Sequence, residues 1–257
     1  MSWRALRRTG MTLSEVRVNI DRVDREIKEL LKQRMALSEQ VVLVKAKNGD
    51  AIYKPERELE LINKLTEDVD SGIKQEYTAI IKRIMDISRK YQYGRMLELR
   101  DCFDIDYCET QPDNTANVLN DFTQGVIISK GKYELNSELI KYLLSHNKYV
   151  YYMEKLSFEG RNIKAVSCTD RLTVLDSHNR LYIRILCGAD SRRLGIVLTM
   201  ISDCGVDISD IITVNENGDY SIFAELCCNM KQKEIKALIF QLECETDGCN
   251  ILGSYRL

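Results

Sequence analysis

The residues from Leu13 to Asn48 carry an apolar pattern that is typical of one long α-helix. Apolar residues recur at alternating steps of four and three, which places them on one helical face. They are Val16, Ile20, Val23, Ile27, Leu30, Leu37, Val41 and Val44. The series skips one place, which Arg34 occupies. Because a guanidinium group within an apolar stripe is costly unless an anion meets it, the pattern predicts a helix built around an anionic ligand.

Arg17 and Lys45 lie on the same helical face as Arg34 or at its border. Arg34 and Lys45 are roughly 16 Å apart along the helix and nearly eclipsed, so both can contact one metabolite-sized molecule. Arg17 lies roughly 25 Å from Arg34 at about 1.5 Å per residue, too far to share that ligand. A symmetric partner chain would give Arg17 another role, and it would also cover apolar surface that a small monomer leaves exposed.

The composition limits the classes of function. The chain has 257 residues and a formal net charge of −2, which allows two modest domains and gives no reason to expect nucleic acid. No apolar run approaches the roughly 20 residues needed to cross a membrane. Residues 1–10 are basic without an apolar core, so we expect a flexible start rather than a secretion signal.

The cysteine pattern indicates a reducing compartment. There are 9 cysteines, none before Cys102, and none forms a C-x-x-C pair. The 2 histidines lack metal-site spacing. We therefore expect free cysteines, a cytoplasmic protein and no bound metal.

Two further helices are expected after the first. Polar residues and a glycine at 47–50 end the long helix, and Pro55 suits the first turn of the next. A third helix is expected at 74–93. Its stripe consists of Tyr77, Ile81, Ile84, Ser88 and Tyr91. Ser88 interrupts this stripe, and Gln92 lies one turn further on the same side.

In combination, these residues resemble the all-helical chorismate mutase family over residues 11–93. The resemblance is carried by Arg17, Arg34, Lys45, the run I-Y-K-P-E-R-E that ends in Arg57-Glu58, and S-R-K-Y-Q from Ser88 to Gln92. It implies a three-helix domain in an intertwined homodimer, in which each site borrows an arginine from the partner's long helix. Arg17 matches that borrowed arginine.

The resemblance implies conversion of chorismate to prephenate in aromatic amino acid biosynthesis, with no cofactor. This pericyclic reaction needs groups that hold a dianion and stabilise negative charge on the breaking ether oxygen, as fixed cations and amides do. In the family pattern, Arg34 clamps a carboxylate, and Lys45 and Gln92 donate hydrogen bonds to the ether oxygen. Glu58 accepts a hydrogen bond from the substrate hydroxyl.

The family pattern also gives Arg57 a supporting role and places Ser88 against a carboxylate. One departure is Lys54, where the family often has an aspartate. The hydroxyl contact of that aspartate would be lost or made by the backbone.

The middle of the chain carries no recognisable site. Residues 94–120 are rich in aspartate and predict a linker. Residues 121–178 predict an accessory α/β segment, with strands at 125–129, 149–153 and 163–175 and a helix at 136–146.

The last third predicts a ferredoxin-like βαββαβ module at 179–257. Its strands are expected at 181–186, 208–214, 220–227 and 250–255, and its helices at 192–204 and 231–245. This segment resembles the ACT regulatory domain, and its ending I-L-G-S-Y is most similar to the version on prephenate dehydratases.

Two departures affect what an ACT-like module would bind. The P-G-A-L run of the dehydratase version corresponds here to Ser191-Arg192-Arg193-Leu194, and its E-S-R-P run to Ile212-Thr213-Val214-Asn215. In the dehydratase version these two runs frame the phenylalanine site. Two arginines there would fill the site or change its charge. The module would then bind an amino acid or other small effector, an anionic one included, or serve only in dimerisation.

Two alternatives to a mutase follow from the same residues. One is a non-catalytic regulator that keeps the helical scaffold, and the other is a mutase with a vestigial prephenate dehydratase region. No G-x-G-x-x-G run occurs, so a fused dehydrogenase is not expected.

Overall fold

The computed structural model describes residues 10–113, 115, 118–119, 121–122, 126–129 and 131–257. Almost all of the start expected to be flexible, 1–10, lies outside the described residues, as does the first residue of the strand expected at 125–129. The chain divides into two compact units, Met1–Cys102 and Phe103–Leu257.

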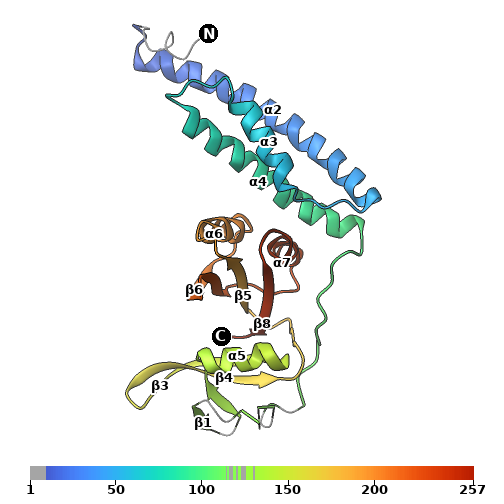
Figure 1. The fold of residues 1–257 in the computed structure, drawn as a ribbon, viewed down its shortest axis with the longest axis vertical. Helices are drawn as coiled ribbons and strands as arrows, with labels where there is room; N and C mark the ends of the chain where they lie inside the picture. Colours follow the sequence, from blue (N-terminus) through green and yellow to red (C-terminus); the bar gives the residue numbers. More distant parts are fainter. Residues whose placement is uncertain (1–9, 114, 116–117, 120, 123–125, 130) are drawn as a thin grey trace. The chain divides into compact units, whose positions relative to one another are not determined.

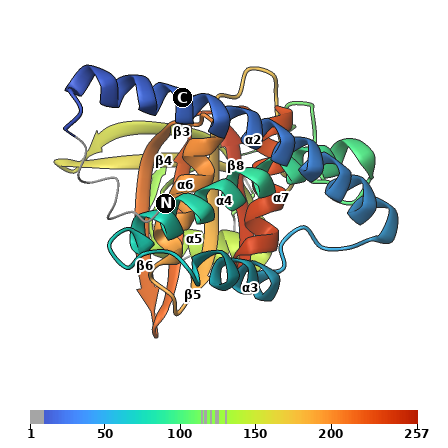
Figure 2. The ribbon, with the colours of Figure 1, turned by 90° about the horizontal axis from the view of Figure 1, so that it is seen from above.

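The N-terminal unit consists of three helices, α2 (Leu13–Asn48), α3 (Pro55–Thr66) and α4 (Lys74–Leu99), seen in Figure 1 and from above in Figure 2. Thr12 caps α2 through a capping box with Glu15, and Gly49 ends it in the left-handed conformation. α4 continues past the expected end at 93, and Met96 on its added turns is buried. Part of the expected linker is therefore helical.

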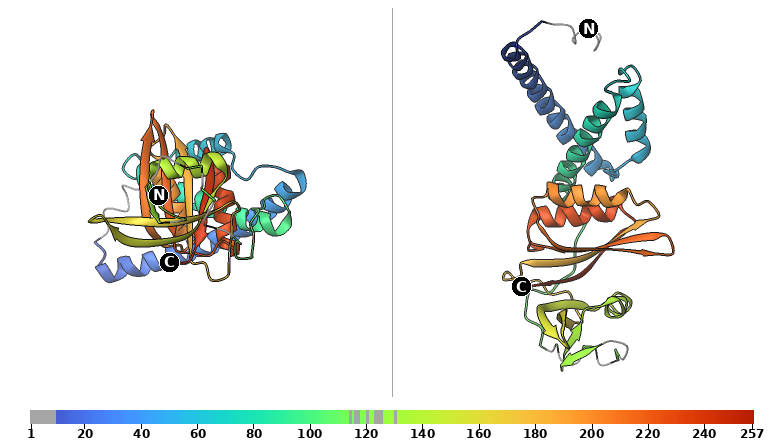
Figure 3. Two further views of the ribbon diagram at one scale, coloured as in Figure 1. Left: turned by 90° about the horizontal axis from the view of Figure 1, so that it is seen from below. Right: turned by 90° about the vertical axis from the view of Figure 1, so that its left-hand side faces the viewer.

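The apolar stripe of α2 remains exposed in the single chain. Its exposed fractions run from 37% at Val16 to 63% at Leu30, whereas Ser38 and Val42 are buried. The face that packs on α4 is therefore a neighbouring one, and the stripe is apolar surface that the single chain leaves exposed. The N-terminal half of α2 extends away from α3 and α4 in the right-hand view of Figure 3.

The C-terminal unit is built on one mixed sheet in the order β1-β2-β4-β3-β8-β5-β7-β6. The strands are β1 (Ile127–Ser129), β2 (Lys132–Glu134), β3 (Tyr149–Phe158), β4 (Arg161–Thr169), β5 (Arg180–Gly188), β6 (Ile208–Glu216), β7 (Asp219–Leu226) and β8 (Gly248–Tyr255). Neighbouring strands are antiparallel except β3 and β8, which meet in parallel at Val150 and Gly253.

The second half of this sheet has the expected ferredoxin-like order. β5, α6 (Arg193–Asp203), β6, β7, α7 (Lys233–Glu245) and β8 follow one another as βαββαβ. α6 and α7 lie side by side on one face of the sheet, as Figure 3 shows. Ile183, Ile185 and Ile222 pack with them in one apolar core.

The opposite face of the sheet holds a second core beneath α5 (Ser137–His146). Leu139 and Leu143 of α5 pack there with Tyr182 and Phe223. Because successive strand residues point to opposite faces, β5 and β7 contribute to both cores. The accessory segment and the ferredoxin-like module thus share one sheet.

The end of the expected linker also belongs to this unit. Phe103, Ile105 and Tyr107 pack against the α6–α7 core. The Cys108 amide donates to the Leu172 carbonyl at 2.7 Å. None of the described helices is long and apolar enough to cross a membrane.

Candidate active site

A row of hydrogen-bonded polar side chains joins α2 to α4 in the N-terminal unit. The Ser38 and Ser88 hydroxyl oxygens lie 2.7 Å apart. Gln92 Nε2 donates to Ser88 Oγ at 3.4 Å, and Lys45 Nζ donates to Gln92 Oε1 at 3.4 Å. Ser88 and Gln92 are buried, so the interruption of the α4 stripe is a polar site between the helices.

Arg34 lies partly buried at one end of this row. Its Nη1 donates to the Ile84 carbonyl at 3.4 Å. Burial lowers the pKa of Arg34, and the charge of Glu58 partly opposes that shift. The guanidinium is therefore incompletely solvated and leaves several donors for an anion.

Lys45 lies partly buried at the other end. Its Nζ also donates to the Ile52 carbonyl at 2.7 Å. Burial lowers the pKa of Lys45, the nearby Lys54 lowers it further, and Asp50 and Glu58 oppose the shift. The charge of Glu58 acts on both Arg34 and Lys45, so its carboxylate lies within electrostatic reach of the two cations.

Glu58 is held by Arg89, a residue that the sequence analysis missed. Arg89 is only 7% exposed; it forms an ion pair with Glu58 and donates to Asp86 at 2.7 Å. Its guanidinium carbon lies 4.9 Å from the centre of the Tyr53 ring. Arg89 lies one turn after the buried Met85, and this helical spacing could have indicated a buried arginine.

Three other residues considered from sequence lie outside this cluster within one chain. Arg57 is exposed and pairs with Glu60 at 3.4 Å. Arg17 lies on the exposed first half of α2. Lys54 pairs with Asp50 at 3.0 Å, and its positive charge acts on Lys45 from the edge of the cluster.

Residues 16–93 match the family model of chorismate mutase type II. The matched region lies within the three helices of the N-terminal unit. It contains the row of polar side chains, both partly buried cations and Glu58. No group of metal-ligating side chains occurs in the part of the chain that the structure describes.

No curated protein matches the chain. Among solved structures, prephenate dehydratase from Arthrobacter aurescens with L-Phe is 14% identical, with a TM-score of 0.35, covering 39% of this chain and 35% of that one. Prephenate dehydratase from Staphylococcus aureus is 18% identical, with a TM-score of 0.33, covering 37% of each. The chain thus spans little over a third of these dehydratases.

A third solved structure, described as GqqA, a novel type of quorum-quenching acylase, is 10% identical, with a TM-score of 0.42. It covers 62% of this chain and 86% of that one. Similarity this low assigns no function to the C-terminal unit.

Proposed function

We propose that the protein is a cytoplasmic chorismate mutase that converts chorismate to prephenate for aromatic amino acid biosynthesis. The observation that carries this proposal is that partly buried Arg34 and Lys45 lie at the two ends of one polar row that contains Gln92, within the region that matches chorismate mutase type II. A cluster with two cations and one resident carboxylate suits a dianionic substrate better than an apolar one.

The geometry supports a division of labour within the site. Arg34 would bind a substrate carboxylate through its free donors, and Ser88 would add a hydroxyl contact. Lys45 Nζ donates to Gln92 Oε1 at 3.4 Å, and Gln92 Nε2 donates to Ser88 Oγ at 3.4 Å. An ether oxygen beside Lys45 would accept from Nζ, and it would also accept from Gln92 once the amide turns its Nε2 away from Ser88. Stabilising the charge that develops on that oxygen lowers the barrier.

Glu58 would accept a hydrogen bond from the substrate hydroxyl. Its ion pair with the buried Arg89 orients the carboxylate. Arg89 therefore fills, within this chain, the supporting role that the family resemblance gave to Arg57. The site requires no cofactor for a pericyclic step.

A second copy of the chain would complete the site. The first half of α2 exposes Ile20, Val23 and Ile27 together with Arg17. Covering this apolar face with the same helix of a partner would bury it and bring Arg17 of one chain towards the site of the other.

We propose an ACT-like regulatory or dimerising role for the ferredoxin-like half of the C-terminal unit. At the start of α6, Arg192 pairs with Asp190 at 2.9 Å and Arg193 pairs with Asp247. Both arginines thus already have carboxylate partners, which favours dimerisation over anion sensing at this helix start.

Purified protein mixed with chorismate tests the mutase. We expect loss of chorismate absorbance and accumulation of prephenate that persists, as a mutase without dehydratase activity requires. Arg34→Ala should lower kcat/KM at least about 100-fold, since it removes charge stabilisation in the site, while circular dichroism shows unchanged helix content.

Lys32→Ala is the matched control. Lys32 is an exposed cation paired with Glu29, and two residues along a helix place it on the opposite side from Arg34. Its kcat/KM should stay within about twofold of the wild type. Absence of chorismate turnover would favour the regulator alternative, and decay of prephenate would favour the vestigial dehydratase.

A further inference from the structure

The C-terminal unit contains a cavity of about 530 Å³ between α5 and the sheet. Its walls come from α5, from β4 and from β5, β6 and β7. This volume is within the range of small-molecule sites, roughly 300–1,000 Å³. The cavity is distinct from both the mutase site and the arginines at the start of α6.

The cavity wall is mainly apolar. Ile140 and Leu144 line it from α5, and Ile212, Val214 and Phe223 line it from the sheet. Alternate residues of β6 face this side because side chains in a strand alternate between faces. The sheet face opposite α6 and α7 therefore offers a pocket for an apolar group.

Arg184 lies in the wall without a carboxylate partner among the described residues. Its Nη2 donates to Ser221 Oγ at 3.2 Å, and its guanidinium carbon lies 5.8 Å from the centre of the Phe223 ring. Its Nε is buried and has no hydrogen-bond partner. Its Nη1 donates to no acceptor among the described residues, and an anionic ligand in the cavity would supply one.

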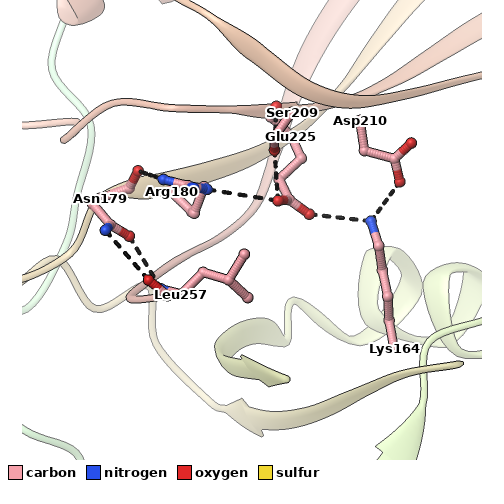
Figure 4. A network of polar contacts seen from close by, with 7 residues as sticks. All are labelled: Lys164, Asn179, Arg180, Ser209, Asp210, Glu225 and Leu257. Carbon is pink, nitrogen blue, oxygen red and sulfur yellow. Dashed lines mark hydrogen bonds and ion pairs between the residues drawn. The ribbon is translucent and has the colours of Figure 1, made fainter. Parts of the chain in front are cut away.

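The lysine and the carboxylates of the cavity wall and its border pair with one another, as Figure 4 shows for Lys164, Asp210 and Glu225. Lys164 Nζ donates to Asp210 at 2.5 Å and to Glu225 at 3.1 Å. Glu225 is fully buried and also accepts from Ser209 Oγ at 2.6 Å. At the rim, Lys141 and Glu216 lie 3.7 Å apart. Arg184 is thus the cation of this wall that still has an unused donor.

We propose that this cavity binds a small organic monocarboxylate with an apolar body. The carboxylate pairs with Arg184, and the body lies against Phe223, Ile212 and the apolar side of α5. An uncharged ligand of the same shape leaves the guanidinium unpaired, so the site distinguishes the two by charge.

Isothermal titration calorimetry of the full chain with 3-phenylpropionate tests this proposal, with 3-phenylpropionamide as the uncharged counterpart. We expect saturable binding of the carboxylate at one site per chain, and at least tenfold weaker binding of the amide. Binding of both with equal affinity, or of neither up to about 10 mM, would overturn the proposal.

Arg184→Met removes the charge and keeps much of the side-chain volume, and it should weaken 3-phenylpropionate binding at least tenfold. Arg192→Met is the matched control. Arg192 is an exposed arginine outside the cavity that is already paired with Asp190, so its loss should leave the affinity unchanged. Equal affinity in Arg184→Met, or equal losses in both variants, would contradict the assignment.

Ile212→Glu gives a second test that does not depend on Arg184. Ile212 lines the cavity but is 51% exposed, so the substitution is compatible with folding. A carboxylate there should repel the ligand and compete for Arg184, again lowering the affinity at least tenfold. Chorismate turnover by the same variants reports on the mutase site separately, so failure of either proposal is distinguishable.

Discussion

At the scale of single residues, Lys45 shows how the site is tuned. A lysine stabilises a developing negative charge only while it is protonated. Burial lowers the pKa of Lys45 from its ordinary 10.5, and the nearby Lys54 lowers it further. The family's aspartate in place of Lys54 would oppose this shift, so the departure noted in the sequence has an electrostatic consequence.

We therefore expect kcat/KM to fall as pH rises through the lowered pKa of Lys45, with a midpoint below 10.5. Lys54→Gln removes one cause of the lowering and should move this alkaline limb to higher pH. pH–rate profiles with chorismate measure both effects. Lys32→Gln, which removes a distant exposed charge, should leave the midpoint in place, and a wild-type rate that stays constant beyond pH 10.5 would contradict the role of Lys45.

At the scale of elements, the contact between β3 and β8 joins the accessory segment to the ferredoxin-like half. The two strands meet at Val150 and Gly253. A Cβ atom on residue 253 would lie 2.1 Å from the Val150 carbonyl oxygen, so only glycine permits this close approach.

Gly253→Ala should lower the free energy of unfolding by about 1–3 kcal/mol, the typical cost of forced overpacking, as measured by urea denaturation. Gly195→Ala is the control, because a Cβ atom there meets nothing within 4 Å and the residue lies in α6. The free energy of unfolding of Gly195→Ala should equal that of the wild type or exceed it by up to about 1 kcal/mol. An equal free energy of unfolding for Gly253→Ala and the wild type would contradict this prediction, because it would mean that β3 and β8 can move apart at no energetic cost.

At the scale of the whole molecule, the proposed homodimer depends on the exposed half of α2. Apolar residues there are too regularly spaced and too exposed for a surface helix that faces only water. Arg17 lies in the same half, remote from Arg34 along the helix.

Mixing Arg17→Ala chains with Arg34→Ala chains tests whether Arg17 acts across the dimer. After unfolding and joint refolding, mixed dimers would contain one site with both arginines intact. The mixture should therefore exceed either parent in kcat/KM and approach one quarter of the wild-type value for random pairing. As the reference, Lys32→Ala chains mixed with Arg34→Ala chains give the kcat/KM expected when one of the two chains has no defect in the site. A mixture no more active than its parents would place Arg17 outside the site.

The sequence determined the element types because they depend on local periodicity. Alternating steps of three and four marked α2 and α4, and the βαββαβ order of the last third is confirmed. It also singled out Arg34 and Ser88, since each breaks an apolar stripe, and Gln92, which lies one turn after Ser88 on the same side. By contrast, the end of α4 at Leu99 was missed because the burial of Met96 is a tertiary contact.

Only the tertiary structure decided which of these residues meet. Arg89 looked like an ordinary helix residue until folding placed it against Glu58, while the equally charged Arg57 faces water. Arg184 is a second example, because only the folded structure shows that its Nε is buried without a hydrogen-bond partner. Periodicity along the chain fixes which face a side chain occupies, but the partner of a charge comes from a distant segment, and that pairing decides its chemistry.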